Sequence, residues 1–363
     1  MSNGEERTRA RALGIAPGVL PPGRWNSITD VPGVQVGQLT KVEGKTVRTG
    51  VTAILPHEGN LLADRVPAGL SVANGHGKLA GATQIEELGE IETPIVLTNT
   101  LAVPRAADAI LDWTLAQQGN ESAISINPVV GETNDGWLSA IEERPLSVEN
   151  VTTAIETATT GPIEEGCVGA GTGTSAMGWK AGIGTSARLL PRELEGCTLG
   201  VLVQSNFPGS LLVLGHPIGK ILDIDSLATS RRDAEPPGSI MIILATDAPL
   251  SDRNLARLAR RAFAGLARTG ASFSNGSGDY AIAFSTAEPV RRTAARRKGI
   301  GRVDQIANEA SSILFQAAIE ATEEAIYNSL FMAETMTGRN GRTVEAVPLD
   351  RIAALLASNT ADG

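Results

Sequence analysis

A glycine–serine pair, Gly238-Ser239, stands directly before a continuous apolar run and carries the residue type of a hydrolase nucleophile. The run that follows, 240–245, has the β-branched content of a strand buried on both faces. A hydroxyl residue at the start of such a strand is unusual, because the core on either side gains nothing from it. Glycine before it permits a close backbone approach or a strained conformation. We hypothesise that the chain is cut between these two residues, which makes Ser239 a nucleophile with its own free amine; an ordinary loop entering a strand is the alternative.

The sequence offers no evident histidine base for this nucleophile. His57, His76 and His216 each stand beside glycine or proline and fit turn positions, and no Gly-x-Ser-x-Gly elbow is present. A serine at a new N-terminus needs no histidine, because a released α-amine has a pKa of about 7.7–8.0, close to working pH. Such an amine can accept the proton of its own serine hydroxyl.

Four other polar residues could complete a site of this kind. Asn206 follows a predicted strand and could donate an amide hydrogen bond to a tetrahedral oxyanion. Ser277 and Asp279 share one tight turn and could orient the nucleophile through a hydroxyl–carboxylate relay. Glu132, on a loop at the end of a predicted strand, could hold a substrate cation. From spacing alone, each of the four also fits a capped or solvated turn residue.

Other kinds of site have weak support in the sequence. The glycines of 169–173 lack the spacing of a dinucleotide fingerprint, and no Gly-Lys-Ser/Thr follows them. The three histidines and the two cysteines, Cys167 and Cys197, show no metal-ligand spacing. We therefore expect neither a metal nor a cofactor, and we expect the cysteines to be buried reduced thiols.

Composition narrows the class of protein further. The chain has 363 residues, 42% hydrophobic content and a net charge of −9, which argues against a nucleic-acid-binding protein. The polar segment 1–11 has no apolar core of a secretory signal, and no apolar stretch approaches the length of a membrane span. A cytoplasmic enzyme or binding protein that does not contact membranes is the expectation.

Strand and helix patterns alternate in mixed order, and several apolar strands have the composition of doubly buried ones. This arrangement favours a layered α/β fold in which helices cover the sheet faces. We expect residues 1–11 to be a loosely held arm, 226–237 to be a linker, and the helix at 303–332 to be apolar on one face. The other predicted strands are 34–36, 51–55, 95–99, 124–130, 199–204 and 280–285, with 211–214 paired to 221–224, and the other helices are 81–88, 106–115, 147–157 and 251–268.

Eight collinear stretches make the chain resemble one known family, that of the L-aminopeptidases/D-esterases and β-peptidyl aminopeptidases (DmpA/BapA). They include Gly131-Glu132-Thr133-Asn134-Asp135-Gly136 and Asn275-Gly276-Ser277-Gly278-Asp279-Tyr280. The whole set runs nearly end to end: 26–34, 131–136, 168–173, 182–185, 238–241, 245–250, 275–280 and 333–339.

The resemblance implies a fold and a maturation step. The family folds as a four-layer αββα sandwich, similar to N-terminal-nucleophile hydrolases but with its own connectivity. Its members are made as a precursor that cuts itself before the nucleophile, here between Gly238 and Ser239. The single domain 1–363 would then consist of an α chain, 1–238, and a β chain, 239–363. Family members commonly assemble as homotetramers of such αβ heterodimers.

The resemblance also assigns roles to individual residues. Ser239 would form an acyl-enzyme, and Ser277 and Asp279 match the Ser-Gly-acid pair that assists the nucleophile. Asn206 matches an oxyanion-hole asparagine, and Glu132 matches an acid that binds the free amino group of the substrate. These five residues form the expected site. Trp137 stands where some members have a tyrosine, which leaves the oxyanion hole and the shape of the acyl pocket open.

The sequence is thus interpreted as a self-processing serine aminopeptidase without a cofactor. Its substrates would be short peptides, amides or esters with a free amine. An acyltransferase similar to ornithine acetyltransferase is the alternative enzyme, although that family has threonine where this chain has Ser239. A non-catalytic binding protein on the same scaffold is the third possibility, and it would require loss of site residues that are present here.

Overall fold

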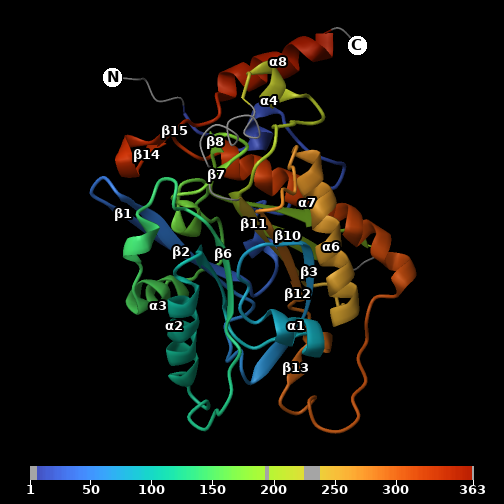
Figure 1. The fold of residues 1–363 in the computed structure, drawn as a ribbon. Coiled ribbons are helices and arrows are strands. Elements are labelled where there is room, and N and C mark those ends of the chain that lie inside the picture. The colour runs from blue at the N-terminus through green and yellow to red at the C-terminus, as the bar shows by residue number, and fades with distance from the viewer. Residues whose placement is uncertain (1–5, 193–195, 225–237, 362–363) are drawn as a thin grey trace.

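Two stacked β-sheets with helices on their outer faces make up the protein (Figure 1). The structure is a computed structural model that describes residues 6–192, 196–224 and 238–361. The expected linker 226–237, with Pro236-Pro237, lies outside the described residues. The predicted αββα architecture is confirmed.

The smaller sheet has four strands in the order β1-β2-β5-β6. The first three pair antiparallel, and β6 is the parallel edge strand. Their bounds are β1 Gln35–Glu43, β2 Val47–Leu55, β5 Ile95–Asn99 and β6 Val129–Thr133.

The larger sheet has seven strands in the order β13-β3-β12-β11-β10-β9, and β4 pairs with β3 beside this path. The central pair β11–β12 is parallel, whereas β11 and β10 are antiparallel. The bounds are β3 Asp64–Gly75, β4 Glu90–Ile91, β9 Ile183–Leu189, β10 Thr198–Asn206, β11 Ser239–Thr246, β12 Gly278–Ser285 and β13 Arg292–Thr293.

Three apolar clusters fill the spaces between the four layers. One lies under α2 and α3 on the small sheet, one lies between the sheets, and one lies under α6 and α7 on the large sheet. The helices are α1 Ala82–Leu88, α2 Val103–Leu115, α3 Val148–Glu156, α4 Ile218–Ile221, α6 Asp252–Arg268, α7 Ser312–Phe331 and α8 Leu349–Ala361, and the short strands are β7 Ser175–Ala176, β8 Trp179–Lys180, β14 Met336–Thr337 and β15 Thr343–Val344. None of the described helices is long and apolar enough to cross a membrane.

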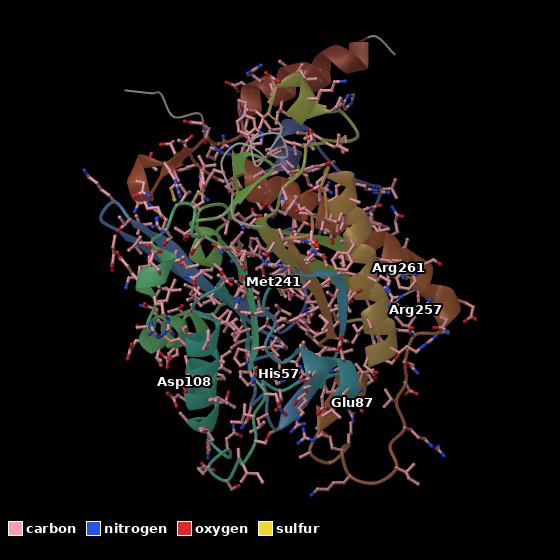
Figure 2. The ribbon with its side chains drawn as sticks, viewed as in Figure 1. His57, Glu87, Asp108, Met241, Arg257 and Arg261 are labelled. Carbon is pink, nitrogen blue, oxygen red and sulfur yellow. The ribbon has the colours of Figure 1, made fainter. Side chains whose placement is uncertain are left out.

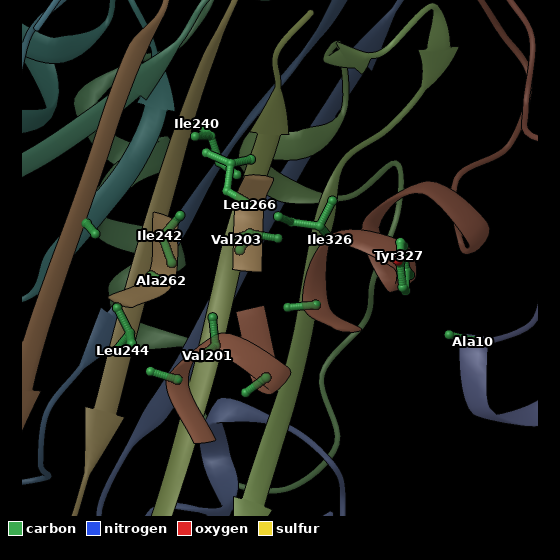
Figure 3. Close-up of a cluster of buried hydrophobic side chains, with 14 of the residues drawn as sticks. Ala10, Val201, Val203, Ile240, Ile242, Leu244, Ala262, Leu266, Ile326 and Tyr327 are labelled. Carbon is green, nitrogen blue, oxygen red and sulfur yellow. The ribbon is translucent and has the colours of Figure 1, made fainter. Parts of the chain in front are cut away.

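The central strand β11 shows why its sequence is apolar at every position. Ile240, Ile242 and Leu244 face the cluster under α6 and α7 (Figure 3), whereas Met241 and Ile243 face the cluster between the sheets. Successive side chains of a strand point to opposite faces. The predicted doubly buried strand is confirmed, and the same alternation directs residue 239 to the space between the sheets.

Three of the local predictions differ from the structure. The strand expected at 124–130 begins only at Val129 and continues to Thr133. The segments 211–214 and 221–224 do not pair as strands, because 218–221 forms the short helix α4. Cys197 is buried as expected, but Cys167 is partly exposed, and no disulfide joins the two cysteines.

The N-terminal segment and α7 depart from expectation together. Helix α7 begins at Ser312 rather than 303 and is buried on its polar side as well as its apolar side. The N-terminal arm contributes to this burial, because Arg11 pairs with Glu324 of α7 at 2.8 Å. A second ion pair, between Arg9 and Glu165 at 2.7 Å, also holds the arm. Residues 6–11 are therefore held by ion pairs, and the prediction of a loose arm is wrong for them.

A fully buried ion cluster lies beneath this segment. The side chain of Arg188, on β9, is completely inaccessible and lies 2.7 Å from Glu324 and 3.3 Å from Glu320. The Glu320 carboxylate also accepts hydrogen bonds from the backbone N–H groups of Val19 and Leu20, at 3.0 Å each. The cluster thus joins β9, α7 and the N-terminal segment.

Candidate active site

Ser239 is the first residue of β11 and lies between two strand ends. It pairs with Asn206, the last residue of β10, on one side and with Gly278, the first residue of β12, on the other. Only 6% of its surface is exposed. Strand register therefore brings together residues that are far apart in the sequence.

One backbone donor serves both atoms of the suspected cleavage site. The Gly278 N–H lies 3.2 Å from the Ser239 hydroxyl oxygen and 3.1 Å from the carbonyl oxygen of Gly238. Glycine is required at 238, because a Cβ there would lie 2.3 Å from a Pro208 side-chain atom and 2.7 Å from the Asn206 carbonyl oxygen. The close backbone approach expected of this glycine is present.

The Asn206 side chain has a fixed orientation. Its carbonyl oxygen Oδ1 accepts a hydrogen bond from the Ser175 N–H at 3.0 Å, and the residue is 6% exposed. Because that contact takes the acceptor end, the NH₂ end remains available as a donor. On the same strand face as Ser239, this amide can serve an oxyanion formed beside the serine.

Ser277 and Asp279 form a buried pair next to Gly278. The Ser277 hydroxyl donates a 2.6 Å hydrogen bond to Oδ1 of Asp279, and both residues are almost inaccessible. Burial raises the pKa of Asp279 to about 6, although the Ser277 hydrogen bond lowers it. The second oxygen, Oδ2, is buried without a hydrogen-bond partner in the described part of the chain. This carboxyl therefore retains unused capacity to accept a proton or a hydrogen bond.

Glu132 lies at the same level of the fold, on β6 of the opposite sheet. Its neighbour Gly131 packs against Met241, which lies in the middle of the molecule (Figure 2). A Cβ on Gly131 would lie 2.5 Å from the Met241 methyl carbon. Glu132 is 3% exposed and accepts a 3.1 Å hydrogen bond from the Lys78 N–H. Burial raises its pKa. Hydrogen bonds from the Thr100 side chain and the Lys78 backbone N–H, and the charge of the Lys78 ammonium 4.0 Å away, partly oppose that shift.

Trp137 does not join this group through any contact that the described residues show. Its ring is covered by the Arg342 guanidinium, whose central carbon lies 4.0 Å from the ring centroid. Arg342 also donates to the Trp137 carbonyl oxygen at 3.4 Å. The indole is thus engaged in a cation–π contact, and its expected place in the substrate pocket stays a prediction.

Sequence reasoning missed three groups of the candidate site. The Gly278 N–H is a backbone group that no side-chain pattern can reveal. Tyr280 shares the inter-sheet face of β12, and strand alternation from 278 could have identified it. Lys78 carries no signal in the sequence, because only the folded chain brings it to Glu132. Among the described residues, no group of three His, Cys, Asp or Glu side chains could hold a metal ion.

Comparison with known proteins decides the family. The model of Peptidase family S58 matches residues 26–344, which include every residue of the site described above. The chain belongs to peptidase family S58. A β-peptidyl aminopeptidase, BapA, from Sphingosinicella microcystinivorans is 40% identical, and the alignment covers 97% of this chain and 92% of that protein.

Two solved structures extend the S58 assignment to the fold. A β-aminopeptidase from a Burkholderia species superimposes with a TM-score of 0.88 at 39% identity. An L-aminopeptidase D-Ala-esterase/amidase from Ochrobactrum anthropi, described as a variant of the N-terminal-nucleophile hydrolase fold, gives 0.88 at 34% identity. Each comparison covers 97% of this chain and 99% of the other. The protein is a serine-type aminopeptidase with this fold variant.

Proposed function

We propose that this S58 peptidase cuts its own chain between Gly238 and Ser239 and then uses Ser239 as the nucleophile of an aminopeptidase. The position of the Gly278 N–H is the observation that carries the proposal. It touches both the hydroxyl that attacks and the carbonyl that is attacked, so it can stabilise negative charge on the Gly238 oxygen.

The cut follows from this geometry in two steps. The Ser239 hydroxyl oxygen attacks the Gly238 carbonyl carbon, the C–N bond to Ser239 breaks, and the hydroxyl proton passes to the nitrogen. Water then hydrolyses the resulting ester, which leaves a carboxylate on Gly238 and a free amine with a hydroxyl on Ser239. The products are an α chain, 1–238, and a β chain, 239–363, within one αββα domain.

Turnover uses the same atoms. The released α-amine, with a pKa of about 7.7–8.0, takes the hydroxyl proton while Ser239 attacks the substrate carbonyl. Ser277 and Asp279 are joined by a short hydrogen bond and flank Gly278, the strand partner of Ser239. From this position they orient the nucleophile and its amine. The free NH₂ end of Asn206 donates to the oxyanion. The leaving amine or alcohol takes a proton, and water resolves the acyl-enzyme.

A free amino group defines the substrate class. Glu132 is a buried carboxylate at the level of Ser239, and the ammonium of a substrate is the cation that suits it. Substrates are thus short peptides, amides or esters with an unblocked N-terminus. One relative is named for β-peptides and another for L-amino acids. These names support substrates in which the amine lies on either the β- or the α-carbon relative to the carbonyl group. We extend to this chain the assembly of four αβ pairs that the family resemblance implies.

Replacement of the nucleophile tests the proposal. Ser239→Ala should leave a single uncut chain without peptidase activity, whereas the wild-type protein should show two chains that meet at 238/239 by intact-mass spectrometry. Ser147→Ala is the matched control, because Ser147 caps α3 in the outer helical layer of the small sheet. The control should be cut and active. A wild-type protein that stays uncut yet active would contradict the mechanism.

A further inference from the structure

Tyr280 lies between the proposed nucleophile and the proposed amine-binding acid. We propose that its hydroxyl is a second receptor for the substrate's amino group, beside Glu132, and that its ring forms the wall between that amine and Ser239. The proposal rests on the proposed function, because it assigns a partner to the same amine.

Strand register sets the position of the Tyr280 backbone. In the parallel pair β11–β12, Tyr280 stands opposite Met241, two residues beyond Gly278 and its partner Ser239. Met241 and Tyr280 both belong to the apolar cluster between the sheets. The tyrosine side chain therefore leaves its strand on the face where Ser239 and Asn206 also lie.

The ring extends back toward the start of the strand. A Cβ on Gly278 would lie 2.9 Å from the ring carbon Cε2 of Tyr280, so the ring lies against residue 278. The N–H of that glycine contacts the Ser239 hydroxyl oxygen. One edge of the ring is thus held beside the nucleophile.

The Tyr280 hydroxyl lies near the carboxylate of Glu132. A Cβ on Gly77 would lie 2.8 Å from Oε1 of Glu132 and 3.8 Å from the Tyr280 hydroxyl oxygen. Both oxygens therefore border the same small space beside Gly77. Burial, followed by the charges of Glu132 and Asp279, raises the pKa of Tyr280, so the phenol stays neutral at working pH.

The hydroxyl has no partner of its own. Tyr280 is 6% exposed, and its hydroxyl makes no hydrogen bond with the residues that the structure describes. The hydroxyl oxygen is not among the completely inaccessible side-chain atoms without a partner, so a ligand can reach it. An ammonium brings three donors and no acceptor, so it can satisfy a carboxylate oxygen and a phenol oxygen together.

Tyr280→Phe isolates this hydrogen bond. For an alanine p-nitroanilide we expect KM to rise about tenfold, as for loss of a hydrogen bond to a charged group, with kcat within about twofold of wild type. Inhibition by alaninamide should weaken by the same factor, while inhibition by propanamide, which lacks the amine, should not change. Tyr327→Phe is the matched control, because Tyr327 is the only other tyrosine and hydrogen-bonds Glu323 and Leu214 far from this site.

Glu132→Gln separates this proposal from the function on which it depends. If Glu132→Gln raises KM and Tyr280→Phe does not, the Tyr280 proposal is wrong and the proposed amine site stands. If neither variant changes KM, both assignments are wrong. A Tyr280→Phe protein that loses kcat, or that is not cut, also contradicts the proposal, because the hydroxyl is assigned to the substrate amine alone.

Discussion

The buried carboxylates beside Arg188 and the buried carboxylate of Asp279 differ in how completely their oxygens are paired. Glu320 and Glu324 face Arg188 and backbone donors, and Arg11 closes the group from the N-terminal side. Asp279 has one hydroxyl partner and a buried oxygen with none. The charges beside Arg188 are paired within the chain. Asp279 has an oxygen that can still accept a proton or a hydrogen bond during a reaction.

The pKa values follow this difference. Burial raises the pKa of Glu320, but hydrogen bonds from Gln316, Val19 and Leu20 and the charge of Arg188 outweigh burial and lower it. Nothing comparable opposes burial at Asp279, whose pKa is raised to about 6. Perturbed carboxyl groups of this second kind gather at functional sites. At Glu320 and Asp279, the donors around the buried acid, rather than burial alone, set the direction of the pKa shift.

The largest effect is expected when the paired group is broken. Arg188→Met leaves two buried carboxylates without their central cation, so we expect a loss of about 3–5 kcal/mol in unfolding free energy. Denaturant unfolding measures it, with Ser239→Ala as the background so that every protein is a single chain. Arg296→Met is the control, because its pair with the exposed Glu288 should contribute under about 1 kcal/mol. Equal losses for both variants would refute the distinction.

An effect of opposite sign is expected at the under-paired acid. In the same background, Asp279→Asn should stabilise the fold at pH 7 by about 1–3 kcal/mol, because it removes a buried charge whose pKa is raised. The folded protein holds this proton more tightly than the unfolded chain, so the background loses stability as pH rises from about 4 to above 6. Asp279→Asn should lack that loss. A destabilised variant at pH 7 would show that the carboxylate is supported after all.

A small effect is expected from the exposed cation beside Glu132. Lys78 is half exposed and lies 4.0 Å from the carboxylate, where it competes with a substrate amine. In the self-cut enzyme, Lys78→Met should lower KM for an alanine p-nitroanilide about twofold, the scale of one exposed ion pair. Lys45→Met, in the β1–β2 turn, is the control and should leave KM unchanged. A higher KM for Lys78→Met would mean that Lys78 aids binding.

Strand positions near Ser239 could be predicted because they depend on local pattern. The apolar run after Gly238 identified β11, and its alternation explains both buried faces. Asn206, Ser277 and Asp279 were identified as strand-end or turn residues, and the register then brought them together. What no local pattern contains is the pairing of β10 with β11 and of β11 with β12, which depends on contacts across the whole chain.

The prediction of the helix at 303–332 was wrong about its first residue and its burial for the same reason. The helix was expected to be apolar on one face only, because sequence periodicity cannot show that Arg11 and Arg188 cover its glutamates. The short helix at 218–221 was also not predicted, because the local pattern favoured a hairpin there. Tertiary partners decided both cases. The strand-end position of Glu132 suggested that it could hold a substrate cation, and the family resemblance specified the free amino group.

The strand order of the large sheet has a consequence for folding. From one edge to the other, β13 belongs to the part after residue 238, β3 to the part before it, β12 and β11 to the later part, and β10 and β9 to the earlier part. The proposed cut therefore divides an interleaved sheet, and neither fragment contains a contiguous half. The uncut chain folds as a unimolecular process, but the cut protein must reassemble from two molecules, at a rate that depends on their concentration. Under the proposed cut, the precursor folds as one chain, and the two mature chains do not refold as readily after they separate. The mature enzyme therefore depends on kinetic stability, that is, on a high barrier to unfolding.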